Sequence, residues 1–326
     1  MSFYTSLSGS RRRTGRSSAS RTARAGSSQR ALAQSAKLEQ AQELRDALNE
    51  FLNLHRQDFP EAVRPIAPAP PPIHTKAIIS AHRAQAVKGI GLFQRAARKA
   101  ALAAADQAAQ REIERQTLNQ EQQRVRYQAQ LDQWWAALVG NDEDVVLSVL
   151  AEAFEDNEAP AAAVGVNGSE LSVVVLVPSI DIVPERRPAT TPAGNLTLKK
   201  LAKAERGGLH TTMVASHVLL TVREALAVAP GITGVRVVAL QHSRNDAFGR
   251  PRVDVLLAAN FERTRLAAVR WDQAEAGTIV DDAATECPTK LRRTTNELQA
   301  LDLSHESAIE ELLAHVELDE LISRQS

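Results

Sequence analysis

The hydrophobic and polar positions divide the chain into a polar first part and an apolar second part. Almost no apolar side chain follows Leu7 in the first 35 residues. We therefore expect residues 1–35 to form a disordered tail, because such a segment cannot offset its ordering entropy by burial. Apolar residues then recur at helical spacing between Leu38 and Leu52, which predicts a short amphipathic helix over residues 36–56.

A proline-rich linker separates this helix from a second helical region. Six prolines crowd into residues 57–73, where they favour an extended, polyproline-like chain. Residues 74–140 are predicted to form a long helical arm, with a kink at Gly89 and Gly91 and no further breaker before Gly140. The arm is polar nearly all round, a pattern typical of helices that bridge parts of a structure or pair with a partner. It is therefore the candidate contact for a homo-oligomer or a protein partner.

Residues 141–290 show the helical and strand patterns of a compact domain. The dipeptide Asn167-Gly168 lies between two apolar runs and is the strongest short hairpin signal in the chain. A proline-rich loop follows, and Asn195 is the predicted start of a long helix that ends before Pro230. Two further apolar runs around a polar loop predict a second strand pair.

The order of these elements predicts an α+β fold. We expect a long N-terminal helical arm, followed by a four-stranded, mainly antiparallel sheet packed on the long helix. The runs VVVLV and VLLAA are apolar throughout, which indicates that parts of the sheet are covered on both faces. Residues 291–326 are predicted to form an acidic C-terminal helix and tail, in which Ser304 caps a helix with Ile309 and Leu312 on its apolar side.

Charge is distributed unevenly along the chain. The whole chain is neutral, but residues 1–140 carry 21 Lys and Arg against 11 Asp and Glu, a balance of +10, and the remainder carries 18 against 28, or −10. A basic arm on an acidic body can bind DNA or RNA, or it can dock on the body. The candidate phosphate-binding residues are the tail arginines Arg11, Arg12, Arg13, Arg16, Arg21, Arg24 and Arg30.

The cysteine count and the apolar runs predict the compartment. Cys287 is the only cysteine, so neither a disulfide within one chain nor a cysteine-rich zinc cluster is expected. No apolar run is long enough to span a bilayer. We predict a cytoplasmic protein with no membrane partner. No cofactor is predicted, because the segment Gly89-Ile90-Gly91 lacks the preceding strand of a dinucleotide-binding site.

The enzyme class that the sequence leaves open to test is a divalent-metal phosphodiesterase. Such an enzyme needs two or three acidic residues that converge at a sheet edge to hold metal ions and activate water. The available residues are Asp254, Glu170, Asp246 and His242. The structural alternative makes Asp246 a turn residue and Asp254 an acid on a strand face. No metal site is otherwise predicted.

Four segments of the compact domain resemble segments of other proteins. They are EAFEDNEAPAA (152–162), VPERRPA (183–189), REALAVAP (223–230) and DAFGRPRV (246–253). In these motifs the chain resembles an uncharacterised family of bacterial proteins over roughly residues 130–285. No activity is known for that family, so the resemblance implies a recurring domain and nothing about catalysis.

These observations favour a non-enzymatic function. The preferred hypothesis is a nucleic-acid-associated or assembly protein, because the charge is split between the two parts of the chain and no convergent catalytic set is evident. The alternatives are the phosphodiesterase centred on Asp254 and a structural subunit of a larger particle.

Overall fold

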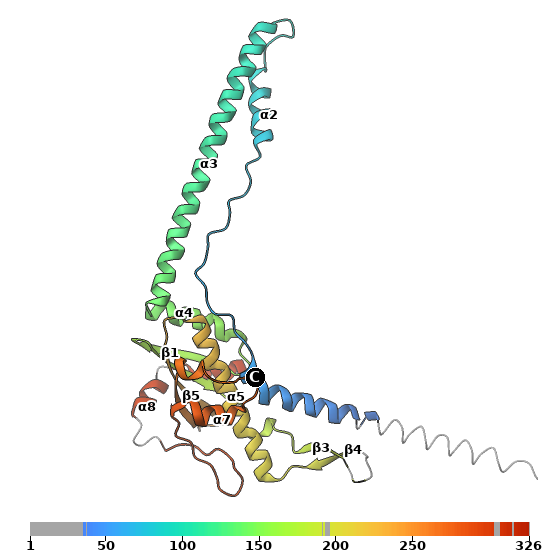
Figure 1. Cartoon of the computed structure of the whole chain (residues 1–326), viewed down its shortest axis with the longest axis vertical. Helices are drawn as coiled ribbons and strands as arrows, with labels where there is room; N and C mark the ends of the chain where they lie inside the picture. Colours follow the sequence, from blue (N-terminus) through green and yellow to red (C-terminus); the bar gives the residue numbers. More distant parts are fainter. Residues whose placement is uncertain are drawn as a thin grey trace, which may run out of the picture.

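A mixed body carries a long, narrow arm that projects away from it (Figure 1). The computed structural model describes residues 35–36, 38–190, 192, 196–302, 307–314 and 316–325. The α+β class predicted from the sequence is confirmed, since helices and strands share the body. The predicted basic tail, apart from Ser35, lies outside the described residues.

The main sheet has five strands, so the prediction of four is wrong. Their order is β1-β2-β5-β6-β7. The pair β2–β5 is parallel and the other three adjacent pairs are antiparallel. The fifth strand, β7, has only three residues at the sheet edge, too few to show a periodic pattern. The strands span Ala161–Asn167, Glu170–Leu176, Gly234–Asn245, Pro251–Glu262 and Ala284–Glu286.

A separate two-stranded sheet replaces the predicted proline-rich loop. Strand β3 (Arg186–Thr190) pairs antiparallel with β4 (Leu196–Lys200). The long helix therefore begins at Lys203 and not at Asn195, which lies outside the described residues. The predicted helix start at Asn195 is wrong because the apolar Leu196, Leu198 and Leu201 fit a helical and a strand pattern equally well.

Helices cover one face of the main sheet. Helix α5 (Lys203–Val228) provides the crossover connection that the parallel strands β2 and β5 require. It shares one hydrophobic core with α4 (Glu143–Ala153), α7 (Ala276–Ala283) and the strand residues Val173 and Val175. This is the sheet-on-helix packing that the sequence predicts, with α5 in the central position.

The C-terminal helices cover the opposite face. The predicted single helix is two short helices, α8 (Ser307–Ala314) and α9 (Leu318–Gln325), and the predicted cap Ser304 lies outside the described residues. Ile309 of α8 packs in a second core with Val174 of β2. The sheet is therefore buried on both faces, which explains its continuous apolar runs. The acidic C-terminal segment docks on the body of its own chain.

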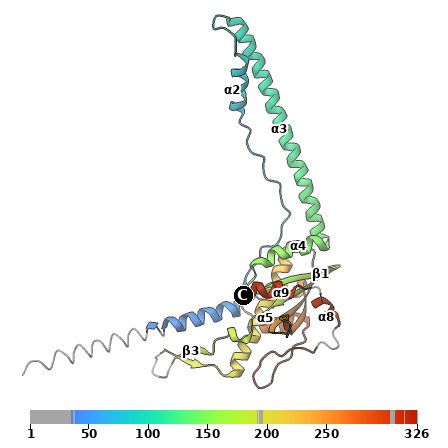
Figure 2. The same cartoon turned by 180° about the vertical axis from the view of Figure 1, so that it is seen from behind.

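The arm is an antiparallel pair of helices. Helix α2 (Thr75–Ala86) lies beside α3 (Arg95–Val139) in both views (Figures 1 and 2). The chain reverses completely between them, where the sequence predicts only a kink at Gly89 and Gly91. With its 45 residues, α3 is about 68 Å long. Among the described residues, no helix combines the length and apolar character that crossing a bilayer requires.

The segment before the arm is anchored in the body. A helix over residues 38–53 continues into the short helix η1 (Leu54–Arg56). There the amide of His55 donates to the hydroxyl of Ser216 (3.0 Å), and its ring Nε2 lies 3.2 Å from the carbonyl oxygen of Ala274. Burial lowers the pKa of His55, so its neutral form is favoured in this site.

An arginine of α5 secures the same segment. One guanidinium nitrogen of Arg223 donates to the carbonyl of His55, and another donates to the carboxylate of Asp58, both at 2.6 Å. The guanidinium also lies 4.3 Å from the ring centre of Trp271, a cation–π distance. These contacts fix the base of the arm on α5.

Candidate interaction site

An extended strap, residues 57–74, connects the base of the arm to α2 and lies against α3. The amide of Ala67 donates to Gln128 (2.8 Å), whose own amide group donates back to the carbonyl of Pro65 (3.2 Å). The amide group of Gln120 donates to the carbonyl of Pro71 (3.2 Å). Proline offers a carbonyl but no N–H, so glutamine side chains with both donors and acceptors suit this partner. The strap is thereby held along α3.

Two ion pairs fix the alignment of the strap and α2 along α3. Arg64 of the strap pairs with Asp132 (2.7 Å), and Arg83 of α2 pairs with Asp106 (2.6 Å). Both pairs are exposed, so each contributes little to stability. Their positions near the two ends of α3 nevertheless specify one register for the arm.

The arm ends in an exposed apolar tip, which we define as residues 87–94. Gly89 has a φ of +87°, a conformation that glycine tolerates without strain, and its backbone turns the chain from α2 to α3. The two residues that follow the turn, Leu92 and Phe93, are 77% and 99% exposed. An aromatic ring with almost its whole surface in water is unfavourable, and at the end of a projecting element it is typical of a contact site.

The tip is surrounded by positive charge. Between Glu61 and Asp106 the chain has seven Lys and Arg and no acidic residue. Two of these seven form the ion pairs with α3 described above. Within the described part of the chain, no ion pair involves the other five, which are Lys76, Lys88, Arg95, Arg98 and Lys99. The far end of the arm therefore combines exposed apolar side chains with unneutralised basic ones.

The sequence-predicted phosphate-binding residues cannot be placed. Arg11, Arg12, Arg13, Arg16, Arg21, Arg24 and Arg30 all lie outside the described residues. Their proposed contact with DNA or RNA remains a prediction.

The candidate phosphodiesterase residues lie at two ends of the sheet. Glu170 begins β2 and pairs with Gly234 of β5, whereas Asp254 pairs with Gln241 of β5. Seven residues of extended strand separate these two positions on β5, a distance of roughly 23 Å. In the described ranges, no group of three or more His, Cys, Asp or Glu is placed to hold a metal ion.

The two remaining residues of that set have local partners in the β5–β6 turn. The carboxylate of Asp246 accepts hydrogen bonds from the amides of Phe248 (2.8 Å) and Arg250 (2.9 Å). The ring Nε2 of His242 lies 3.0 Å from the side-chain oxygen of Asn245. Both arrangements stabilise the turn, which agrees with the structural alternative for Asp246.

Sequence reasoning missed the tip because it treated Phe93 as part of the helical pattern of the arm. A signal was present in the segment Lys88-Gly89-Ile90-Gly91-Leu92-Phe93, where two glycines precede two large apolar residues inside a long acid-free stretch. A kink would keep these residues within one long helix, whereas the observed reversal places them between α2 and α3 at the end of the arm.

Comparison with family models, with curated proteins and with solved structures finds no match to this chain. The resemblance to an uncharacterised bacterial family therefore rests on its sequence motifs alone.

Proposed function

We propose that the protein is an assembly or interaction protein that contacts its partner through the tip of the arm. The exposure of Leu92 and Phe93 at the end of α3 is the observation that supports this proposal. These side chains make no contribution to the body core, so burial against a partner is the role that suits them. The body then serves as the base from which the arm projects.

The construction of the arm fits this function. The strap, the two ion pairs and the anchored base hold the tip in one position relative to the body. A preorganised contact loses less conformational entropy on binding than a mobile one, so more of the contact energy appears as affinity. We infer that the length of the arm sets the spacing between the body and its partner.

A double substitution at the tip tests this proposal. Leu92→Asp with Phe93→Asp should change the free energy of unfolding by no more than about 0.5 kcal/mol, because both side chains are exposed. To detect contact directly, p-benzoylphenylalanine is placed at position 93 of the full-length protein, which is irradiated in extract of its source cells. We expect one discrete cross-linked product, which excess wild-type protein competes away and the double variant does not.

The matched control uses Phe248, which is 84% exposed in the β5–β6 turn of the body. The photoreactive residue at position 248 should give no such product, and a Phe248→Asp competitor should behave like the wild type. If position 93 gives no product and the protein binds no phosphatidylglycerol vesicles, or if the double variant competes as well as the wild type, the tip is not a contact site.

Nucleic-acid association is a second candidate, favoured by the absence of acidic residues between Glu61 and Asp106 and by the tail arginines. Deletion of residues 1–35 should abolish salt-sensitive binding of DNA or RNA, measured by fluorescence anisotropy over a range of salt concentrations. A control variant keeps the tail and replaces Lys88, Arg95, Arg98 and Lys99 with Gln. Undiminished binding by the truncated protein would exclude the tail arginines as the phosphate-binding residues.

A further inference from the structure

We propose that the partner of the tip is a second copy of this chain, and that the tip enters a groove between α6 and α7 of that copy. This inference rests on the proposed function, because it names the partner of the same site. Helix α6 spans Arg263–Leu266, and the groove lies between the loop that follows it and α7.

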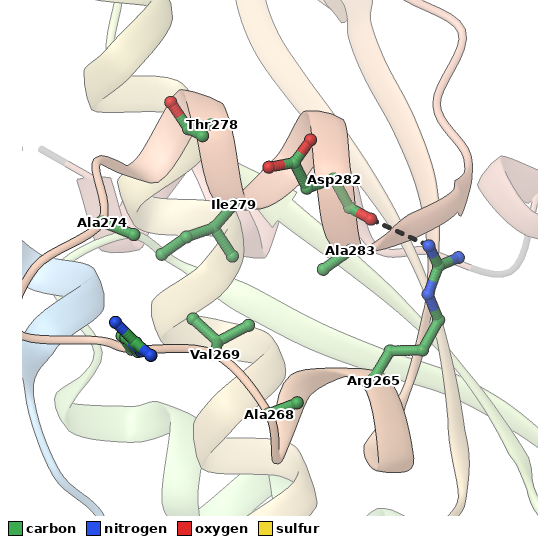
Figure 3. Close-up of a pocket in the computed structure, with 9 residues that line it drawn as sticks. Arg265, Ala268, Val269, Ala274, Thr278, Ile279, Asp282 and Ala283 are labelled. Atoms are coloured by element: carbon green, nitrogen blue, oxygen red, sulfur yellow. Dashed lines mark hydrogen bonds between the residues drawn. The ribbon is translucent and has the colours of Figure 1, made fainter.

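The groove has the shape and chemistry that the tip requires. Its volume is about 550 Å³, within the range of pockets that enclose small ligands or side chains. Figure 3 shows Val269 and Ile279 facing each other across it. Three alanines, Ala268, Ala274 and Ala283, complete an apolar floor without filling the space. A leucine and a phenylalanine side chain would replace water over these apolar surfaces.

One end of the groove is fixed by Arg265. Its guanidinium donates to the carbonyl oxygens of Asp282 (2.8 Å; Figure 3) and Ala284 (3.3 Å). The side chain therefore joins the C-terminal end of α7 to the segment around α6. The groove is open and preformed, so an occupant does not have to separate the two helices.

The charges of the tip and of the groove are complementary. Residues 87–99 carry four basic residues and no acid, a charge of +4. Residues 263–286, from α6 to the end of β7, form the segments around the groove and carry five acids and three arginines, a charge of −2. Arg265, Arg270 and Asp282 line the groove itself, and the exposed carboxylates of Asp272, Glu275 and Asp281 lie in the segments that flank it. Opposite potentials steer the two surfaces together and oppose the pairing of tip with tip.

The arm cannot deliver its own tip to its own groove. The C-terminal end of α3 is attached to the body through Leu138, which is buried in the body core together with the partly buried Trp135. The tip lies at the opposite end of a helix of about 68 Å. A second copy must therefore supply the groove. Because tip and groove are different surfaces, repeated contacts generate a ring or a chain of copies.

Sedimentation velocity of the full-length protein tests this inference. The average mass of the wild-type species in solution should rise with protein concentration. It should fall when salt is added, because part of the attraction is between exposed charges. Phe93→Asp removes the apolar contact, and Ala268→Arg fills the groove and adds a positive charge at an exposed position. Each variant alone should associate roughly 30-fold or more weakly, the change typical for loss of a central aromatic contact.

Mixing the two variants gives the decisive result. The Phe93→Asp chain keeps an intact groove and the Ala268→Arg chain keeps an intact tip, so an equimolar mixture should form 1:1 dimers and nothing larger. Circular dichroism checks that both variants are folded, and Phe248→Asp should associate like the wild type. A mixture that stays monomeric overturns the inference. So does a Phe93→Asp variant that assembles normally, as it would if copies paired along α3.

The cross-link from position 93 separates this inference from the proposed function. A product that joins position 93 to residues 267–283 of a second copy supports both. A product with a different polypeptide, or binding of phosphatidylglycerol vesicles without self-association, overturns the inference and leaves the tip as a contact site. No product and no vesicle binding would overturn both.

Discussion

Replacing Phe154 with alanine should lower the free energy of unfolding by about 3–5 kcal/mol, the range for large-to-small changes in a buried core. The ring is 1% exposed and packs in the core between the sheet and its helices. The backbone carbonyl of the same residue accepts a hydrogen bond from Arg324 of α9 (2.6 Å). The substitution removes the ring from the main core but keeps this backbone carbonyl, so we expect the loss of stability to come from the core contacts.

Urea unfolding followed by tryptophan fluorescence measures this effect, because Trp135 and Trp271 pack against the same core. Phe248→Ala is the matched control, since it deletes the same ring from an exposed position. We expect that control to change stability by no more than about 0.5 kcal/mol. A loss below about 1.5 kcal/mol for Phe154→Ala would mean that α4 can repack without this ring.

Stability should also depend on pH through Glu224. Burial raises the pKa of its carboxyl group to about 7, and the nearby carboxylate of Asp156 adds to the shift. The folded state therefore holds a proton that the unfolded state releases near its ordinary pKa of about 4.5. The contribution of this group is most favourable below pH 4.5 and is lost as the pH rises through 7. We expect the change to be about 1–3 kcal/mol.

A comparison with Glu224→Gln isolates this effect. The glutamine is neutral at every pH, and its side-chain oxygen can keep the contact with the amide group of Asn157. The variant should match the wild type in urea unfolding at pH 4.5 and exceed its stability at pH 8. Asp156→Asn should reduce the difference without abolishing it. An equal pH dependence in the wild type and Glu224→Gln would show that folding does not raise the pKa of this carboxyl group.

The stability of the wild type and of Glu224→Gln must be compared at each pH, because the buried histidines change stability with pH in the opposite direction. Burial lowers the pKa of His55, His210 and His217. Their unfolded forms take up protons first as the pH falls below about 6.5, so stability decreases on acidification. These contributions are common to the wild type and the Glu224 variant, and they cancel in the difference.

Elements with local signals could be predicted from the sequence. Asp142 accepts a hydrogen bond from the amide of Val145 and caps α4, as its position before an apolar run indicates. The hairpin at Asn167-Gly168 forms with Gly168 at a φ of +64°. In each case the information lies within a few residues, where propensity and turn chemistry decide the conformation.

Elements that depend on distant partners could not be predicted. Strand β7 is defined by pairing with β6, and nothing in its three residues specifies that neighbour. Strand β4 exists because β3 pairs with it, although its own leucines also suit a helix. The parallel pairing of β2 with β5 joins segments separated by the whole of α5. Such long-range contacts leave only weak traces in local periodicity.

The candidate site shows the same contrast between local signals and contacts of distant residues. The sequence predicts the arm as a candidate contact element, but its most evident binding signal is the set of tail arginines and not the tip. The exposure of Phe93 depends on a reversal that Gly89 permits and that the strap fixes through Gln120 and Gln128. Each of these glutamine hydrogen bonds joins residues that are 49 to 63 positions apart in the sequence, too far apart to appear in a local pattern.

The anchoring of His55 also determines the order in which the chain can complete its fold. Its ring contacts Ala274, 219 residues later in the sequence. At synthesis rates of about 5–20 residues per second, roughly 11–44 s pass before that partner is made. Helices α2 and α3 can pair long before then, because their contacts are close in sequence. The arm is therefore assembled while its base is still unattached, and synthesis of the body then fixes an element that has already formed.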